Sequence, residues 1–193
     1  MNLNAGLIGG GSWGTTVAAL IARNAPVTLW ARNAATVDEI NSRHTNSRYL
    51  PDAVLPEAVR ATADIEEAVA MKDVVVKGVP SQSFRGVLEQ IKPHVRPWVP
   101  IISLSKGLEL STHKRMTELI NEVLPGHPAG ALSGPNLARE IMAGYAAGSV
   151  IAMEDEVIVR ELQKLFHSGL FRVYTNLDVI GCELGGVLKN IIA

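Results

Sequence analysis

The sequence predicts an α/β fold, a doubly wound and mostly parallel sheet with helices on both faces. Short apolar runs alternate with helical patterns along almost the whole chain, as expected where crossover helices join parallel strands. A glycine cluster separates the first apolar run from the first helical pattern. The length of 193 residues suits one large domain or little more.

The first elements form a strand, helix, strand unit. Residues 3–8 are an apolar run, and Val17, Leu20 and Ile21 then recur at helical spacing beyond the glycines. A second apolar run, residues 27–30, follows a break at a proline, which cannot continue a helix. These 30 or so residues therefore predict a βαβ unit.

The remaining elements follow from the same patterns. Residues 44–56 are polar, contain two prolines and have no periodicity, which predicts a long surface loop. We expect further strands at residues 74–76, 101–104, 129–132, 150–153 and 171–174. We expect further helices at residues 82–92, 113–124, 137–142 and 157–166.

The end of the chain predicts a helix with one strongly buried face. From Leu184 onward, apolar residues stand at positions 184, 187, 188, 191 and 192, the spacing of an apolar stripe. The pattern runs to Ala193 without a glycine, a cap or a polar ending. Because helices normally carry a stop signal, we expect the chain to be part of a longer protein and this helix to lack part of its packing partner.

Composition argues against several classes of protein. Eighteen basic and 19 acidic side chains nearly balance, whereas nucleic acids and membrane surfaces favour a basic excess. Cys182 is the single cysteine, so no intramolecular disulfide and no thiolate zinc site can form. No apolar run is long enough to span a bilayer, and the histidines have no metal-ligand spacing. We expect a cytoplasmic protein with no metal, nucleic-acid or membrane partner.

The glycine cluster has the spacing of a dinucleotide-binding loop. Gly9, Gly11 and Gly14 occupy the three glycine positions of GxGxxG, with Ser12 and Trp13 between them. In this motif the first glycine permits the turn, the second lets backbone approach a diphosphate, and the third lets the helix pack on the strand. The diphosphate would lie at the helix N-terminus. Because the motif follows a strand and opens a helix, we predict a Rossmann-type dinucleotide site.

Arg32 bears on which dinucleotide is bound. NAD-preferring domains usually place a carboxylate at the end of the second strand, where this sequence has Arg32 and Asn33. A guanidinium suits a 2′-phosphate. We therefore predict NADPH or NADP as the preferred cofactor and NAD as the weaker one; the alternative is a solvated strand-end arginine.

Seven segments together resemble the bacterial NAD(P)-dependent glycerol-3-phosphate dehydrogenases. The resemblance runs along the whole chain in order. The segments are residues 9–14, 29–32, 49–51, 79–81, 105–109, 133–136 and 185–190. In that family a cofactor domain is followed by a helical domain that completes the substrate site. The resemblance thus implies a dinucleotide-binding domain at residues 1–180 and the first turns of a helical substrate domain at residues 181–193.

The resemblance also implies roles for single residues. It implies an enzyme that interconverts sn-glycerol 3-phosphate and dihydroxyacetone phosphate, supplies glycerophospholipid precursors and forms a homodimer at full length. Cofactor contacts are implied for Ser12, Trp13, Arg32, Lys106 and Ala138. Substrate contacts are implied for Lys106, Gly134, Asn136 and Lys189, with Lys189 as general acid and base.

The residues themselves give partial support to the two lysines. Reduction of a ketone needs an acid or a cation at the oxygen. Lys106 follows an apolar strand, where open α/β sheets bind ligands. Lys189 would share a helix face with Cys182, Gly186 and Ala193, and small neighbours leave room for a ligand. The alternatives are a solvated Lys106 and glycines that serve only helix packing.

Other interpretations remain open at this stage. If the two lysines converge, each should lower the pKa of the other. Asn136 could cap the helix that follows it as well as bind substrate. Lys77 ends an apolar strand, so we expect its ammonium to reach water or a carboxylate. Rival functions are a reductase of a small carboxylated ketone or hydroxy acid, and a non-catalytic dinucleotide-binding module.

Overall fold

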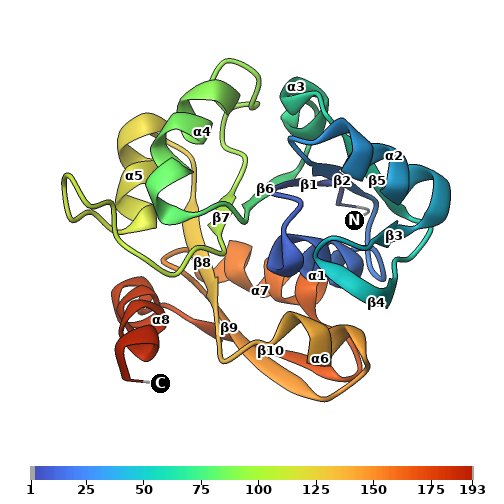
Figure 1. Ribbon diagram of the computed structural model, residues 1–193. Helices are drawn as coiled ribbons and strands as arrows, with labels where there is room; N and C mark the ends of the chain where they lie inside the picture. The colour runs from blue at the N-terminus through green and yellow to red at the C-terminus, as the bar shows by residue number, and fades with distance from the viewer. Residues whose placement is uncertain (1–2, 193) are drawn as a thin grey trace.

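The computed structural model describes the backbone of residues 3–192 and the side chains of residues 3–189. An eight-stranded sheet runs through the molecule in the order β10, β9, β8, β7, β6, β1, β2, β5. Neighbouring strands are parallel except at β8 and β9, which pair antiparallel. Helices lie on both sides of this sheet (Figure 1). The predicted doubly wound α/β class is confirmed.

The elements are bounded as follows. The sheet consists of β1 (Ala5–Ile8), β2 (Val27–Trp30), β5 (Val59–Thr62), β6 (Val74–Lys77), β7 (Ile101–Ser103), β8 (Ala129–Ser133), β9 (Ala147–Met153) and β10 (Phe171–Asn176). A separate two-stranded sheet pairs β3 (Thr45–Asn46) with β4 (Leu50–Val54). The helices are α1 (Ser12–Ile21), α2 (Ala34–Arg43), α3 (Ile65–Val69), α4 (Phe84–Ile91), α5 (Met116–Val123), α6 (Ala138–Met142), α7 (Glu156–Phe166) and α8 (Val179–Ile192), with a short 3₁₀ turn η1 (Ser81–Ser83) before α4.

The chain reverses its winding direction at β1. From β1 it proceeds through β2 to the edge strand β5, and then returns to β6 on the other side of β1. The first residue after β1 and the first after β6 therefore lie beside each other. Ligands of open α/β sheets bind at such a switch point, outside the carboxyl ends of the strands.

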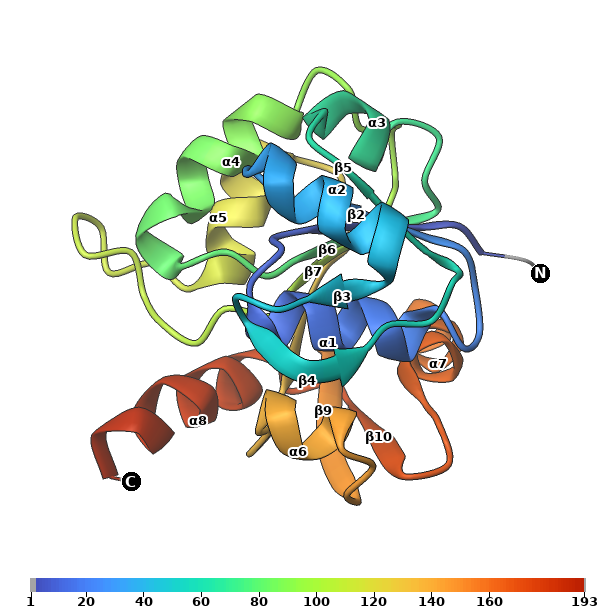
Figure 2. The ribbon, with the colours of Figure 1, turned by 45° about the vertical axis from the view of Figure 1, so that its right-hand side comes forward.

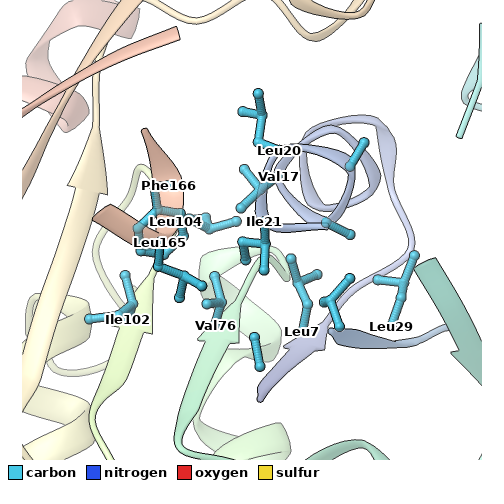
Figure 3. Packing of buried hydrophobic residues seen from close by; sticks show 14 of the residues in the cluster. Leu7, Val17, Leu20, Ile21, Leu29, Val76, Ile102, Leu104, Leu165 and Phe166 are labelled. Carbon is cyan, nitrogen blue, oxygen red and sulfur yellow. The ribbon is translucent and has the colours of Figure 1, made fainter. Parts of the chain in front are cut away.

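Two apolar clusters cover the two faces of the sheet. The first contains Leu7 and Val76 from the strands together with Val17 and Ile21 of α1 and Phe166 of α7, all completely buried. Figure 3 shows α1 end-on above the strands, with these side chains between the helix and the sheet. Since nearly every residue of α1 from Gly14 to Ile21 is buried, packing against β1 fixes where this helix begins.

The second cluster lies under α3, α4 and α5, and the buried Lys77 lies against its member Phe84. Val75 and Phe84 belong to this cluster, and Lys77 is the largest side chain with no exposed surface. Its ammonium nitrogen donates to the carbonyl oxygen of Phe84 and lies 3.6 Å from the centre of the Phe84 ring. Burial lowers the pKa of Lys77 to about 6. The expectation of water or a carboxylate is wrong, because α4 closes over the strand end.

The predicted loop at residues 44–56 is a hairpin, so that prediction is wrong. His44 ends α2 in the left-handed conformation, with φ of 53°, and the β3–β4 hairpin follows. Asn46 and Leu50 are buried although the segment has no apolar periodicity. The hairpin lies across α1 and reaches α6 (Figure 2). Burial of Asn46 and Leu50 against other parts of the fold therefore orders a segment that the sequence pattern had assigned to a loop.

Two helices and a strand were missed by apolar periodicity. Asn33 caps α2 by accepting from the backbone N–H of Ala35, and Asp64 caps α3 by accepting from that of Glu66. Both are favoured N-cap residues, so the sequence did contain these start signals. The edge strand β5 follows α2 and pairs with β2.

Helix α8 is present, and its apolar stripe is only partly covered by the described residues. It begins at Val179, so the boundary expected between residues 180 and 181 falls in its first turn. Leu184 and Leu188 are 38% and 51% exposed, whereas Glu183 is buried. The residues that the structure describes therefore leave this part of the apolar stripe uncovered, as expected of a helix that lacks part of its packing partner. The side chains of residues 191 and 192 lie outside the described residues.

Candidate functional site

The glycine loop connects β1 to α1 through contacts that only glycine permits. Gly9 has φ of +125°, a conformation that other residues rarely adopt. A Cβ at Gly14 would lie 1.9 Å from the carbonyl oxygen of Gly9, so the third glycine lets α1 begin directly against the strand. Gly9 and Gly14 thus have the structural roles that the motif predicts: Gly9 permits the turn, and Gly14 lets the helix pack on the strand.

The second motif glycine faces open space. A Cβ at Gly11 would meet no atom within 4 Å, and no side chain caps α1, whose N-cap is Gly11. The indole N–H of Trp13, in the first turn of α1, is buried and has no partner among the described residues. A helix N-terminus with free N–H groups attracts anions. The residues present therefore fit a dinucleotide diphosphate.

A cleft of about 890 Å³ opens at this loop. We call it the glycine-loop cleft; its walls are residues 9–14, 30–34 and 78–80, with Arg48 and Tyr49 opposite. Arg32 is exposed and stands on the rim at the end of β2. The structure thus brings Gly9, Gly11, Ser12, Trp13, Gly14 and Arg32 together, as predicted.

Arg48 and Tyr49 are cleft residues that sequence reasoning left without a role. They come from the β3–β4 hairpin, and the guanidinium of Arg48 lies 5.5 Å from the centre of the Tyr49 ring. A stacked cation and aromatic ring offer a flat surface to a base or a ribose phosphate. No periodic signal marks these residues. Only the return of the hairpin over α1 brings them to the cleft.

Lys106 and Lys189 line a second hollow of about 250 Å³, which we call the lysine hollow. Gly134, Cys182 and Gly186 line it too. The ammonium of Lys106 donates to the carbonyl oxygen of Gly134 at 2.5 Å. Burial, and then the charge of Lys189, lower the pKa of Lys106. The two lysines therefore line one hollow, although neither of them lines the glycine-loop cleft.

The small residues of α8 serve packing on one side and leave space on the other. A Cβ at Gly186 would lie 2.7 Å from the hydroxyl of Ser133, whereas one at Gly185 would meet nothing. Burial raises the pKa of the Cys182 thiol, which disfavours the thiolate that a nucleophile needs. Ala193, expected on the same face, lies outside the described residues.

The loop after β8 places Asn136 beside Gly134. The backbone N–H of Asn136 donates to the carbonyl oxygen of Gly134 at 2.9 Å, the oxygen that also accepts from Lys106. The interpretation of Asn136 as a helix cap is wrong. The N-cap of α6 is Leu137, and the Asn136 amide instead donates to Ser149 at 2.8 Å.

Ala138 lines a third hollow, of about 550 Å³, which the N-terminus of α1 and the β3–β4 hairpin also border. Ser12, Arg48 and Tyr49 line it as well, and the last two also border the glycine-loop cleft. Ala138 thus lies near the cleft, as the resemblance implies.

Two other features concern metals and membranes. Among the described residues, no three His, Cys, Asp or Glu side chains are grouped so that they could hold a metal ion. No helix in this part of the chain combines the length and hydropathy that a membrane span requires.

Comparisons with known proteins agree with this geometry. Residues 4–159 match the family described as NAD-dependent glycerol-3-phosphate dehydrogenase N-terminus. A glycerol-3-phosphate dehydrogenase [NAD(P)+] 2 of Sphingopyxis alaskensis is 68% identical over this whole chain, which covers 58% of the relative. A protein of the same name from Mycolicibacterium paratuberculosis is 54% identical over 97% of this chain, and the match covers 57% of that relative. The chain thus spans somewhat more than half the length of these relatives.

Solved structures extend the agreement to three dimensions. Glycerol-3-phosphate dehydrogenase from Coxiella burnetii superposes with a TM-score of 0.92 at 32% identity, over 99% of this chain and 59% of its own. A ketopantoate reductase from Ralstonia eutropha, 19% identical with a TM-score of 0.72 over 97% of this chain and 61% of its own, shares the fold. The family match and the high identity to these relatives place the chain in the NAD-dependent glycerol-3-phosphate dehydrogenase family, of which it represents the N-terminal part.

Proposed function

We propose that this chain binds NADPH, and NADH more weakly, in the glycine-loop cleft. The observation that carries the proposal is the bare backbone cradle: Gly11 faces open space at an uncapped helix N-terminus. The family relatives are named for NAD(P)+. Arg32 on the rim supports the preference for a 2′-phosphate, since the position carries no carboxylate.

We further propose that the longer protein interconverts sn-glycerol 3-phosphate and dihydroxyacetone phosphate, and so supplies glycerophospholipid precursors. A bound dihydronicotinamide would supply hydride to the carbonyl carbon. The chain must then supply a proton to the oxygen and stabilise the charge that develops there. Lys189, exposed at the lysine hollow, gives and takes this proton. Lys106 is held by Gly134 and neutralises the charge, while Gly134 and Asn136 position the substrate.

The lowered pKa of Lys106 indicates that the lysine hollow suits a negatively charged group. Burial and the neighbouring Lys189 charge both disfavour the ammonium form of Lys106, as expected for two cations that converge on one site. A negatively charged substrate phosphate or alkoxide would offset the repulsion between the two ammonium groups. The remaining phosphate contacts would come from residues beyond position 193.

The two rival functions have less support. A pyrroline-5-carboxylate reductase and a ketopantoate reductase share the fold at less than 20% identity, whereas the relatives that match at 54% to 68% are named glycerol-3-phosphate dehydrogenases. A non-catalytic dinucleotide module would have no use for two lysines that border one hollow.

Tryptophan fluorescence tests cofactor binding directly. Trp13 and Trp30 line the cleft, so saturating NADPH should quench their emission and raise the melting temperature. Emission and melting temperature that stay unchanged would contradict the proposal. NADPH oxidation with dihydroxyacetone phosphate, measured in a version extended to the length of the relatives and in its Lys189→Ala variant, tests turnover. We expect turnover that the variant largely loses.

The division into a cofactor domain at residues 1–180 and the start of a substrate domain at residues 181–193 is part of this proposal. So are a cytoplasmic location and a homodimer at full length. Sedimentation of the extended protein measures the last of these, and a monomer at micromolar concentration would contradict it.

A further inference from the structure

The amide of Asn136 is held in one orientation by Ser149. Ser149 lies on β9 and is 2% exposed. Its hydroxyl oxygen lies 3.0 Å from the carbonyl oxygen of Ser133, which can only accept, so the serine proton is used there. The lone pairs of Ser149 remain for Asn136, 2.8 Å away, and the Asn136 atom that faces them is the nitrogen Nδ2. The hydrogen-bond pattern therefore assigns the amide orientation.

The carbonyl oxygen Oδ1 is the free end of this amide. It is buried and has no hydrogen-bond partner among the described residues. A buried acceptor without a donor is unfavourable, so a ligand that donates here removes a cost. Two donors near Oδ1 are already used, because the Lys106 ammonium and the Asn136 backbone N–H both donate to the carbonyl oxygen of Gly134.

We propose that Ser149 is a positioning residue which fixes Asn136 as an acceptor, so that the site selects a neutral N–H or O–H donor at this point. A free amide could rotate and present either end; one fixed by Ser149 presents only Oδ1. The inference rests on the proposed function, whose two ligands both carry such a donor. These are the carboxamide NH₂ of the nicotinamide and a hydroxyl of the three-carbon substrate.

Nuclear magnetic resonance of the ¹⁵N-labelled chain tests the orientation without a ligand. The side-chain NH₂ of Asn136 should show cross-relaxation with the methylene protons of Ser149 and slow exchange with water. Ser149→Ala should make that exchange fast. The matched control is Ser103→Ala, which removes another buried serine, one that accepts from Ser105 and has no hydrogen bond with Asn136. An NH₂ group that shows no cross-relaxation with Ser149, or that responds equally to both variants, overturns the assignment.

Two ligand pairs test the selection and identify the donor. NADP⁺ is compared with its 3-acetylpyridine analogue, which lacks the NH₂ donor, and dihydroxyacetone phosphate with acetol phosphate, which lacks the hydroxyl. In a version extended to the length of the relatives, the unaltered protein should prefer the donor-bearing member of one pair by about tenfold, and Ser149→Ala should reduce this to about threefold or less. The pair that shows the preference identifies which ligand supplies the donor. In an Asn136→Ala background, Ser149→Ala should have no further effect on that preference.

Two results distinguish the failure of this inference from the failure of the proposed function. Equal binding within both pairs, or a preference that survives Ser149→Ala, overturns the inference while cofactor binding stands. Absence of binding by all four compounds at millimolar concentration overturns the proposed function and the donor selection together. Melting temperatures of the variants establish that they are folded.

Discussion

The side-chain amide of Asn46 donates to the carbonyl oxygen of Gly10 across 3.0 Å and to the hydroxyl of Thr15 across 2.9 Å. Asn46 has no exposed surface. These two bonds tie the β3–β4 hairpin to the glycine loop and to α1. The hairpin residues that border the cleft, Arg48 and Tyr49, therefore depend on Asn46 for their position.

Asn46→Ala should lower the free energy of unfolding by about 1 to 3 kcal/mol, because two buried acceptors lose their donor. It should also weaken NADPH binding, since the hairpin no longer closes the cleft. Urea denaturation and fluorescence titration measure the two effects. Asn41→Ala is the control: Asn41 bridges Ala61 through two hydrogen bonds but lies away from the cleft, so stability should fall while NADPH affinity is kept. Equal NADPH affinities in both variants would contradict a role for the hairpin.

Two glycine substitutions should separate stability from binding. Gly14→Ala places a Cβ 1.9 Å from the Gly9 carbonyl oxygen and should destabilise the protein by about 1 to 3 kcal/mol. Gly11→Ala meets open space at φ of −78°, so stability should change by less than about 0.5 kcal/mol. Its methyl group would occupy the diphosphate position, and NADPH affinity should fall about tenfold or more. Unchanged affinity in Gly11→Ala would place the diphosphate elsewhere.

Arg32→Ala should weaken NADPH binding about tenfold and NADH binding about twofold or less, because only the former carries a 2′-phosphate for the guanidinium. Isothermal titration with both cofactors measures the difference. Arg60→Ala, on the neighbouring strand β5 and outside the cleft lining, should leave both affinities unchanged. Equal weakening of the two cofactors by Arg32→Ala would remove the case for a 2′-phosphate contact.

Lys77 should make stability depend on pH. Its pKa falls from an ordinary 10.5 to about 6 in the folded protein, so between these values the unfolded chain binds one more proton. Stability should therefore rise with pH across this window, by about 1.4 kcal/mol per unit at most. Below pH 6 both states are protonated and the slope disappears.

Lys77→Met should abolish that slope and raise stability at neutral pH, because methionine fills the site without a charge to desolvate. Urea denaturation at pH 6.5, 7.5, 8.5 and 9.5 measures the slope in both proteins. Lys164→Met, a change at an exposed lysine, should retain the slope of the unaltered protein. If Lys77→Met kept the slope of the unaltered protein, Lys77 would not be the source of that slope. Lys77 would then be protonated in the folded protein as it is in the unfolded chain.

Lys189→Ala should raise the pKa of Lys106, because the Lys189 charge is one of the two causes that lower it. Burial of Lys106 remains, so the pKa should stay below 10.5. Side-chain ¹⁵N resonances followed against pH measure the change, with Lys164→Ala as a distant control. A Lys106 pKa that is equal in the unaltered and Lys189→Ala proteins would mean that the two ammonium groups do not interact.

The sequence by itself determined the sheet except for its edge strand β5, the glycine loop and the family. Residues 3–8, 27–30 and 74–76 are short apolar runs that predicted strands, and β1, β2 and β6 lie there in the sheet. Gly9, Gly11 and Gly14 have the spacing that a strand-to-helix turn requires. These signals are local, because period and turn chemistry act within a few residues. For the same reason, the helix caps Asn33 and Asp64 were readable in principle.

Only the tertiary structure decided the hairpin, the buried state of Lys77 and the acceptor end of Asn136. Asn46 bonds to Gly10 across 36 positions, and Ser149 to Asn136 across 13. The exposed leucines of α8 are a further case, since the start of α5 covers the face with Glu183, whose carboxylate accepts from Arg115 and Thr117. Contacts between distant segments carry no periodic signal in sequence, and they decide orientation and burial one residue at a time.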